Sequence, residues 1–350
     1  MLLQEHVPLG PRTTLGVGGR SRWFAEIRSE DDLRESVGWA QSRSLPLFVL
    51  GGGSNLVVSD EGFPGLTLHV ALRGIEHRKT GVFDAAAGED WDGFVAQAVT
   101  SDCAGVECLS GIPGTVGGSP VQNVGAYGQD VSETIVSVRA FKVATGDFVE
   151  FSSSDCKFAY RRSRFNSNDV GNFIITRVQF ALMPNGRPKI EYADLKKHFA
   201  GRTESPSLQE TRDAVRAIRH RKAMLIVEGD EDSRSAGSFF KNPVVDAGTF
   251  ERIAEDGRCQ GVTPPSYPAE NGRVKIAAAW LVEQSGLSKG FSLGPVAISR
   301  RHALAIVNRG GAKAQDVIAL KNLIQQRVRD KFGIELKPEP VFVGFGSDQP

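Results

Sequence analysis

The sequence predicts an α+β protein of two or three domains, and three observations support this class. Helical and extended apolar patterns alternate along the chain, and no internal repeat stands out. The length of 350 residues exceeds the roughly 100–200 residues of one domain. The 39 glycines in 350 residues lie above the usual share of about 7% and gather in clusters. Such clusters indicate that the backbone approaches another group closely.

Charge and cysteine pattern exclude several classes of protein. The 42 Lys and Arg balance 41 Asp and Glu, so no overall field favours binding to nucleic acid. No stretch approaches the ~18 consecutive apolar residues of a membrane span, and the first ten residues lack the layout of a signal peptide. We therefore expect a cytoplasmic protein. The four cysteines form no C-x-x-C pair and the six histidines have no ligand spacing, which argues against a metal site or a disulfide framework.

The first half is expected to combine strands with short helices. One helix is predicted to start at Ser29 and continue through Leu33, Val37 and Ala40, and a second to cover 90–100. Strands are predicted at 46–50, 56–58, 65–70, 82–87, 135–143, 148–151 and 173–182. Residues 144–147 form a good hairpin turn between two of these strands.

The second half is expected to start with a capped helix over 208–222, followed by an acidic linker at 228–232. A strand over 238–245, a helix over 275–284, a strand over 303–307 and a long helix over 314–332 come next. In the last helix, Val317, Leu320, Ile324 and Val328 form one apolar stripe, which predicts a buried face. The domain boundary is expected near 220–235.

Two glycine-rich loops in the first half are candidates for binding a phosphate group. Gly51 to Asn55 follows a predicted strand, so bare backbone N–H groups there can face an anion. This loop is neither a Walker loop nor a Rossmann fingerprint, because it lacks the Gly-Lys-Ser/Thr ending and the G-x-G-x-x-G pattern. A second loop, 111–118, suits the diphosphate of a dinucleotide. The alternative is a pair of ordinary glycine turns.

Several charged residues allow two interpretations each. Arg161 lies among aromatic residues and three further positive side chains in 156–165, and it either binds a carboxylate or lies on an edge strand in water. Arg212, Arg216, Arg219 and Lys222 share one helix face, which is either solvated or faces a phosphate-bearing substrate.

Ser238 and Glu339 are the remaining candidates for chemistry. Ser238 lies between a glycine and two phenylalanines and is either a turn serine or a shielded hydroxyl. No histidine stands at a spacing that suggests a Ser–His–Asp triad, so a hydrolase lacks its base. Glu339 lies between two prolines, either as a surface acid or as a positioned one.

Together these segments resemble the MurB family of UDP-N-acetylenolpyruvoylglucosamine reductases. The resemblance covers nearly the whole chain, through 14–16, 51–55, 111–118, 122–128, 160–161, 237–243 and 338–340. It implies a vanillyl-alcohol-oxidase/PCMH-type FAD-binding fold of two subdomains plus a smaller α+β substrate-binding domain. The subdomains would be 1–70, to which a strand in 335–350 returns, and 71–225, with the substrate domain at 226–334. The stretch 191–195 resembles the subtype with a tyrosine-containing loop.

The resemblance also implies an activity. NADPH would reduce a noncovalently bound FAD, which would then reduce UDP-N-acetylglucosamine enolpyruvate to UDP-N-acetylmuramate in peptidoglycan precursor synthesis. Hydride addition creates an enolate that must be stabilised and protonated. The matched positions assign Arg161 and Glu339 to the developing charge and Ser238 to the protonation of the α-carbon. To assist an anion, Glu339 would have to carry or share a proton.

The resemblance also assigns binding residues, and a monomer is expected. The FAD contacts would come from Gly51, Gly52, Gly53, Ser54, Asn55, Leu56, Ser110, Gly111, Pro113, Gly114, Thr115, Gly117, Asn123, Gly125, Ala126, Tyr127, Gly128 and Ile175. The substrate contacts would come from Tyr192, Lys222, Asn242, Tyr267, Lys275 and Lys289. Two alternatives are another flavin oxidoreductase of the same fold and a noncatalytic flavin- or nucleotide-binding module.

Overall fold

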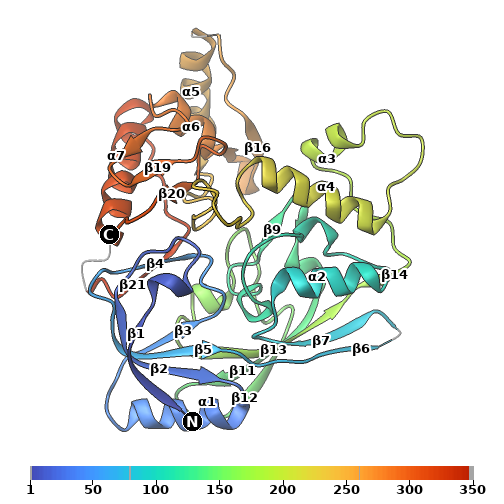
Figure 1. Ribbon diagram of the computed structural model, residues 1–350. Helices are drawn as coiled ribbons and strands as arrows, with labels where there is room; N and C mark the ends of the chain where they lie inside the picture. Colours follow the sequence, from blue (N-terminus) through green and yellow to red (C-terminus); the bar gives the residue numbers. More distant parts are fainter. Residues whose placement is uncertain (1, 79, 260, 347–350) are drawn as a thin grey trace. The chain divides into compact units, whose positions relative to one another are not determined.

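The computed structural model describes residues 2–78, 80–259 and 261–346 (Figure 1). The chain forms two compact units, each assembled from separate stretches of sequence. Unit 1 consists of Met1–Val7, Arg20–Gly53 and Phe63–Leu225. Unit 2 consists of Pro8–Gly19, Ser54–Gly62 and Ile226–Pro350. In the described ranges, no helix combines the length and the apolar character that crossing a membrane requires.

Unit 1 contains a four-stranded sheet with the order β1-β2-β5-β3. Its strands are β1 (Leu3–Pro8), β2 (Arg20–Ile27), β3 (Leu47–Leu50) and β5 (Phe63–Val70). Helix α1 (Glu30–Gln41) packs along this sheet through Leu33, Val37 and Ala40, which are buried (Figure 1). The predicted helix start is confirmed, because the Ser29 side chain accepts the N–H of Asp32 in a capping box.

A second sheet of unit 1 is antiparallel and has the order β12-β11-β13-β7-β6. Its strands are β6 (Ile75–Arg78), β7 (Val82–Ala86), β11 (Ile135–Lys142), β12 (Phe148–Ser152) and β13 (Phe173–Ala181). The predicted hairpin at 144–147 is confirmed by the pairing of β11 with β12. Helix α2 (Trp91–Thr100) begins directly after its N-cap Asp90, close to the predicted start, and buries Phe94 against Phe180 with ring centroids 4.6 Å apart.

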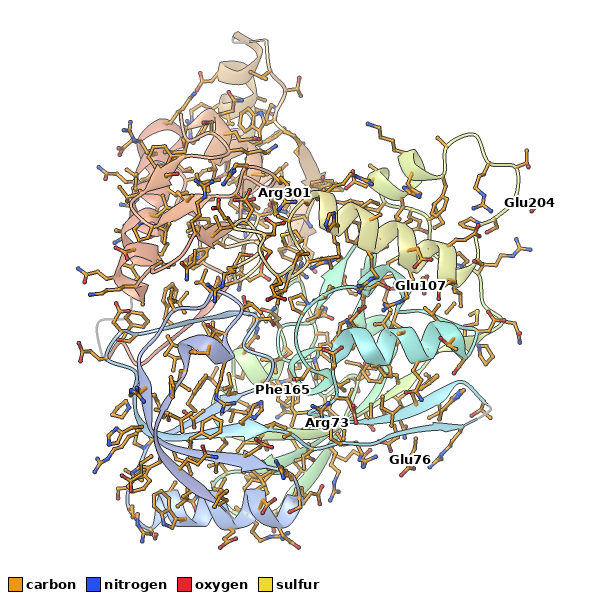
Figure 2. All side chains as sticks on the ribbon, viewed as in Figure 1. Arg73, Glu76, Glu107, Phe165, Glu204 and Arg301 are labelled. Atoms are coloured by element: carbon orange, nitrogen blue, oxygen red, sulfur yellow. The ribbon has the colours of Figure 1, made fainter. Side chains whose placement is uncertain are left out.

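The rest of unit 1 contains α3 (Ala193–His198), α4 (Leu208–Arg221) and two short strand pairs. The pairs are β8 (Cys103–Ala104) with β14 (Met183–Pro184), and β9 (Gly125–Ala126) with β10 (Gln129–Asp130). Glu107 lies between α2 and α4 (Figure 2) and is fully buried. Its carboxylate accepts from Gly105 N, Gln129 Nε2 and Lys189 N, so this buried charge is satisfied by hydrogen bonds.

Unit 2 combines small sheets with helices α5 (Ala247–Cys259), α6 (Ala278–Gln284) and α7 (Ala314–Phe332). The sheet orders are β15-β17-β16, β18-β19-β20 and β21-β4. The strands are β4 (Leu56–Val58), β15 (Val244–Val245), β16 (Ser266–Pro268), β17 (Val274–Ile276), β18 (Ser292–Leu293), β19 (Val296–Ile298), β20 (Ile306–Asn308) and β21 (Val341–Val343). The apolar stripe predicted for α7 is confirmed: its four residues are at most 1% exposed.

Three predictions for unit 2 are wrong in part. The strand expected over 238–245 exists only as β15. Before β15, the N–H of Phe239 donates to the carbonyl of Leu304 and the N–H of Lys241 donates to the carbonyl of Lys337, so the main chain does not pair with one continuous strand. The helix expected over 275–284 begins at Ala278, since the residues before it pair as β17. The strand expected over 303–307 starts only at Ile306.

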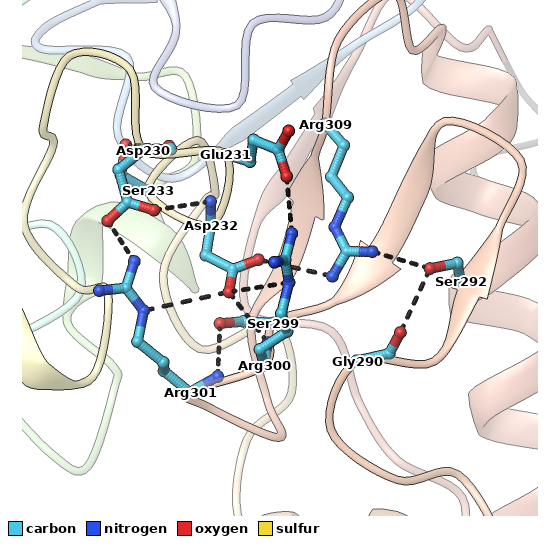
Figure 3. Close-up of polar contacts among 10 residues, drawn as sticks. All are labelled: Asp230, Glu231, Asp232, Ser233, Gly290, Ser292, Ser299, Arg300, Arg301 and Arg309. Carbon is cyan, nitrogen blue, oxygen red and sulfur yellow. Dashed lines mark hydrogen bonds and ion pairs between the residues drawn. The ribbon is translucent and has the colours of Figure 1, made fainter.

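The acidic stretch 228–232 is not a free linker, because its carboxylates form ion pairs within unit 2 (Figure 3). Asp230 pairs with Arg301, and Glu231 pairs with Arg300 at 2.6 Å. Asp232 lies 3.6 Å from Arg309 and also accepts the main-chain N–H of Arg300 at 3.2 Å. These contacts attach the acidic stretch to the loop between β19 and β20 and to Arg309, directly after β20.

Candidate active site

The two predicted glycine loops lie against each other in unit 1. A Cβ atom added to Gly52 would stand 2.6 Å from Cα of Gly114, so only glycine allows this contact. Among the described residues, the main-chain N–H groups of Gly52, Gly53 and Gly114 donate to no protein acceptor, although Gly53 is buried. Close-packed backbone with free N–H groups is the chemistry of a phosphate-binding loop.

Asp92, near the start of α2, supports the second loop. Its Oδ1 accepts the N–H of Gly111 at 2.6 Å, while both carboxylate oxygens accept from Arg212 and one also accepts from Arg216. Burial alone would raise the pKa of Asp92, but the hydrogen bonds from Arg212 and Gly111 lower it below the ordinary value. The carboxylate therefore stays charged and holds the loop at Gly111.

Three of the four positive side chains predicted on one face of α4 bond to protein groups near the second glycine loop. Arg212 and Arg216 pair with Asp92, and Arg219 is only 6% exposed. Arg219 donates from Nε to the carbonyl of Gly111 at 3.1 Å and from a terminal nitrogen to the carbonyl of Met224 at 2.8 Å. This part of the helix face is therefore directed at Asp92 and the glycine loop, although the Arg216 side chain keeps 41% of its surface exposed.

The loop 123–128 contacts the turn that carries Arg161. Asn123 donates from Nδ2 to the carbonyl of Ala159 at 3.2 Å, and Arg161 donates to the carbonyl of Gly125 at 2.8 Å. Asn123, Tyr127 and Arg161 have φ of 48°, 51° and 53°, a left-handed conformation that asparagine tolerates but that costs roughly 1–2 kcal/mol for residues such as tyrosine and arginine. Ten described non-glycine residues have φ between 48° and 56°, and these three are the ones among them that the sequence predicts as site residues.

Tyr127, Tyr192 and Lys222 form a second cluster in unit 1. The rings of Tyr127 and Tyr192 pack edge to face with centroids 5.4 Å apart, and Lys222 Nζ lies 5.8 Å from the Tyr127 ring. Burial lowers the pKa of Lys222, but its 2.6 Å hydrogen bond to Asp194 raises the pKa above the ordinary value. A cavity of about 410 Å³ beside this lysine is lined by Asp194, Lys197, His198, Ile218, Arg221 and Lys222.

The remaining flavin candidates are distributed over both units. In unit 1, the Ser110 hydroxyl is used internally, because it donates to the carbonyl of Glu107 at 2.6 Å, and Ile175 is a buried residue of β13. Ser54, Asn55 and Leu56 belong to unit 2, where Asn55 donates from Nδ2 to the carbonyl of Glu339 at 3.2 Å. The other predicted contacts lie in unit 1. Ala126 is on β9 and Gly117 in a short 3-10 helix, and the rest are in loops: Gly51, Pro113, Thr115 and Gly128.

Ser238 and Glu339 are brought together in unit 2 through the residue that follows the serine. The Phe239 N–H donates to the carbonyl of Leu304 at 2.8 Å, and the Phe239 carbonyl accepts from the N–H of Glu339 at 2.9 Å. The Phe239 side chain is fully buried, so this junction is anchored in the core. The third predicted catalytic residue, Arg161, belongs to unit 1.

His302 is a neighbour of Ser238 that sequence reasoning missed. Its Nε2 atom lies 3.1 Å from Ser238 Oγ, and the two residues are 64 positions apart in the chain. His302 lies in the loop between β19 and β20, where no local pattern marks it. Only the pairing of distant segments could reveal this contact.

Three of the predicted substrate residues in unit 2 lie on or beside one small sheet. Tyr267 on β16 and Lys275 on β17 are direct cross-strand partners, with Nζ 5.7 Å from the ring centroid. Asn242 precedes β15 and accepts the N–H of Ala278 at 2.9 Å. Lys289 does not join them through a described contact; it forms an ion pair with Glu283 at 3.4 Å.

Comparison with known proteins gives one consistent result. Residues 230–343 match the family described as UDP-N-acetylenolpyruvoylglucosamine reductase, C-terminal domain, and residues 22–152 match the FAD binding domain family. The chain is 43% identical to UDP-N-acetylenolpyruvoylglucosamine reductase of Thermobifida fusca, over 97% of this chain and 98% of that protein. It is 41% identical to the reductase of the same name from Nocardia farcinica, over 98% and 90% of the two chains.

A solved structure is similar in fold to this chain over nearly its full length. The crystal structure of UDP-N-acetylenolpyruvylglucosamine reductase from Thermus caldophilus superposes with a TM-score of 0.67 and 25% sequence identity. The match covers 98% of this chain and all of that chain.

Proposed function

Because the chain belongs to the UDP-N-acetylenolpyruvoylglucosamine reductase family, we propose that Arg161, Ser238 and Glu339 are its catalytic residues. The protein is an NADPH-dependent flavoprotein that reduces UDP-N-acetylglucosamine enolpyruvate to UDP-N-acetylmuramate, a step of peptidoglycan synthesis. Its fold is a two-subdomain FAD-binding fold with a smaller α+β substrate domain. The observation that supports the catalytic assignment best is the hydrogen bond from the N–H of Glu339 to the carbonyl of Phe239, the residue directly after Ser238.

The glycine loops of unit 1 fit FAD. The free N–H groups of Gly52, Gly53 and Gly114 would donate to its diphosphate. Because Gly52 and Gly114 pack directly on each other, the dinucleotide would lie along the joined loops rather than between them at this point. FAD bound there would supply hydride chemistry, accepting a hydride from NADPH and delivering it to the β-carbon of the enolpyruvyl double bond.

Arg161 and Glu339 are proposed to act on the substrate carboxylate. Hydride addition at the β-carbon drives negative charge toward the α-carbon and the carboxylate. A guanidinium forms charge-assisted hydrogen bonds to a carboxylate, frequently in pairs, and stabilises the enolate that develops. The turn that holds Arg161 is fixed by Asn123 and by the carbonyl of Gly125, which supports a preorganised role.

Ser238 is proposed to supply the proton that completes the reaction. The Oγ–H bond breaks, a C–H bond forms at the α-carbon, and the hydroxyl regains a proton from solvent. A serine hydroxyl is a weak acid, but an enolate carbon is a strong base, so the transfer is favourable where water is excluded.

The substrate is proposed to contact two groups of residues. Lys222, which retains its charge beside Asp194, suits the diphosphate, while the exposed Tyr192 offers a ring to cover the nucleotide. These residues support the proposal that the chain belongs to the tyrosine-loop subtype. Asn242, Tyr267 and Lys275 would contact substrate from unit 2. We also keep Lys289 as a proposed contact, with its Glu283 partner as a competitor.

We further propose the subdomain limits 1–70 and 71–225, with 226–334 as the substrate domain. The gap between β5 and β6 supports a limit near 70, because one sheet ends and the other begins there. The parallel pairing of β21 with β4 supports the return of the C-terminal strand. A monomer is proposed because every assigned role is filled within one chain. The cytoplasm is proposed because it supplies NADPH and UDP-sugars.

An anaerobic absorbance experiment tests the catalytic assignment. The purified holoenzyme is bleached with NADPH, and UDP-N-acetylglucosamine enolpyruvate is then added without oxygen. We expect the flavin colour to return in the wild type, and Ser238→Ala to bleach normally but regain colour slowly. A variant that loses both half-reactions together would instead indicate damaged cofactor binding, and normal recovery would contradict the role of Ser238.

A further inference from the structure

The contact between Ser238 and His302 has a direction that the proposed chemistry requires. A serine hydroxyl carries one hydrogen and can either donate it or keep it free while accepting another. If the Ser238 hydrogen pointed at Nε2 of His302, 3.1 Å away, it would be withheld from the substrate. If Nε2–H donates to Oγ, the serine hydrogen remains available. A proton donor therefore needs the second arrangement.

We propose that His302 is a positioning residue that donates a hydrogen bond from Nε2 to Ser238 Oγ and holds the hydroxyl ready to protonate the substrate. This inference rests on the proton-donor role proposed for Ser238. It is the reverse of the Ser–His pair in hydrolases, where the imidazole accepts the serine proton and creates a nucleophile. Donation to Oγ also stabilises the negative charge that remains on oxygen when its proton leaves.

The backbone around both residues supports a fixed geometry. Phe239, directly after the serine, donates its N–H to the carbonyl of Leu304, two residues after the histidine. Within the histidine's own loop, the N–H of Ala305 donates to the carbonyl of His302 at 3.1 Å. The two segments are therefore held together close to the side-chain contact, independently of it.

The ion pairs of the acidic stretch 228–232 hold the residues directly before His302 in the loop between β19 and β20 (Figure 3). Arg301, adjacent to His302, pairs with Asp230, and the N–H of Arg300 donates to Asp232 at 3.2 Å. Arg301 N also donates to Ser299 Oγ at 3.1 Å. A loop held by these contacts keeps the imidazole at a defined distance from the serine, as preorganised catalysis requires.

The test compares His302→Ala with His302→Gln in the holoenzyme. Glutamine retains a side-chain N–H at a comparable reach, whereas alanine removes it. We expect His302→Ala to slow the return of flavin colour by about tenfold, the rate equivalent of one strong hydrogen bond. His302→Gln should keep most of the rate. Bleaching by NADPH, FAD content and the substrate concentration at half-maximal rate should change little in either variant.

The double variant Ser238→Ala/His302→Ala separates positioning from other roles. If the histidine acts through the serine, the double variant recovers colour no more slowly than Ser238→Ala alone. The inference is overturned if the two effects multiply, if His302→Ala recovers at the wild-type rate, or if it bleaches as slowly as it recovers. Normal recovery by Ser238→Ala would overturn the proton-donor role and this inference together. Slow recovery by Ser238→Ala with normal recovery by His302→Ala would overturn the inference alone.

Discussion

Replacing Asp92 by asparagine tests whether one carboxylate stabilises both unit 1 and its glycine loop. The side chain keeps its shape and can still accept the Gly111 N–H, but it loses the charge that binds Arg212 and Arg216. Breaking a buried ion pair costs about 3–5 kcal/mol and an exposed pair about 0–1 kcal/mol. Asp92 is 23% exposed and Arg212 11% exposed, so we expect a loss of about 2 kcal/mol.

Thermal unfolding and flavin titration measure the two consequences. A loss of about 2 kcal/mol corresponds to a fall in Tm of about 4–8 °C. Because the Gly111 hydrogen bond then goes to a neutral acceptor, we expect FAD to bind about fivefold more weakly. Asp31→Asn is the matched control: Asp31 pairs with Arg34 at 2.9 Å but is 93% exposed, so its Tm should change little.

The pH dependence gives a second check on Asp92. Its pKa is lowered in the folded protein, so the stabilisation by the carboxylate is present above the ordinary value of 3.8 and is lost as pH falls below it. The Tm difference between wild type and Asp92→Asn should therefore stay constant from pH 8 to pH 5. Equal Tm values for the wild type and this variant, or a difference that vanishes within this range, would refute the reasoning.

Two further predictions concern the flavin loops and the thiols. Gly52→Ala places a Cβ 2.6 Å from Cα of Gly114 and should weaken FAD binding by about tenfold in a flavin titration. The control Gly118→Ala meets only a hydroxyl at 3.8 Å and should bind FAD normally; equal binding by both variants would refute the steric argument. Burial raises the pKa of Cys156 to about 12, so at pH 8 iodoacetamide should label it far more slowly in native than in urea-unfolded protein, as followed by peptide mass spectrometry. Equal labelling rates would contradict its burial.

Features that depend on neighbouring residues could be predicted from the sequence. Ser29 and Ser207 mark helix starts because a capping box needs only residues three positions apart. The buried stripe of α7 follows from the helical period. The glycine loops and the serine segment were also visible locally, and their combination along the chain was specific enough to indicate the family and its cofactor.

Features that depend on distant segments were decided by the tertiary structure. The sequence pattern of residues 238–243 predicts a strand. In the folded chain, their main chain forms hydrogen bonds to segments around Leu304 and Lys337, and no local pattern indicates this pairing. The sequence pattern predicts that Arg219 belongs to a charged helix face. In the folded chain, Arg219 is buried and its guanidinium donates to the carbonyl of Gly111. The contact of His302 with Ser238 likewise exists only in the folded chain. The sequence determined which chemical groups are present and which local structures they favour. Long-range backbone pairing, which joins residues far apart in the chain, decided which of those groups meet.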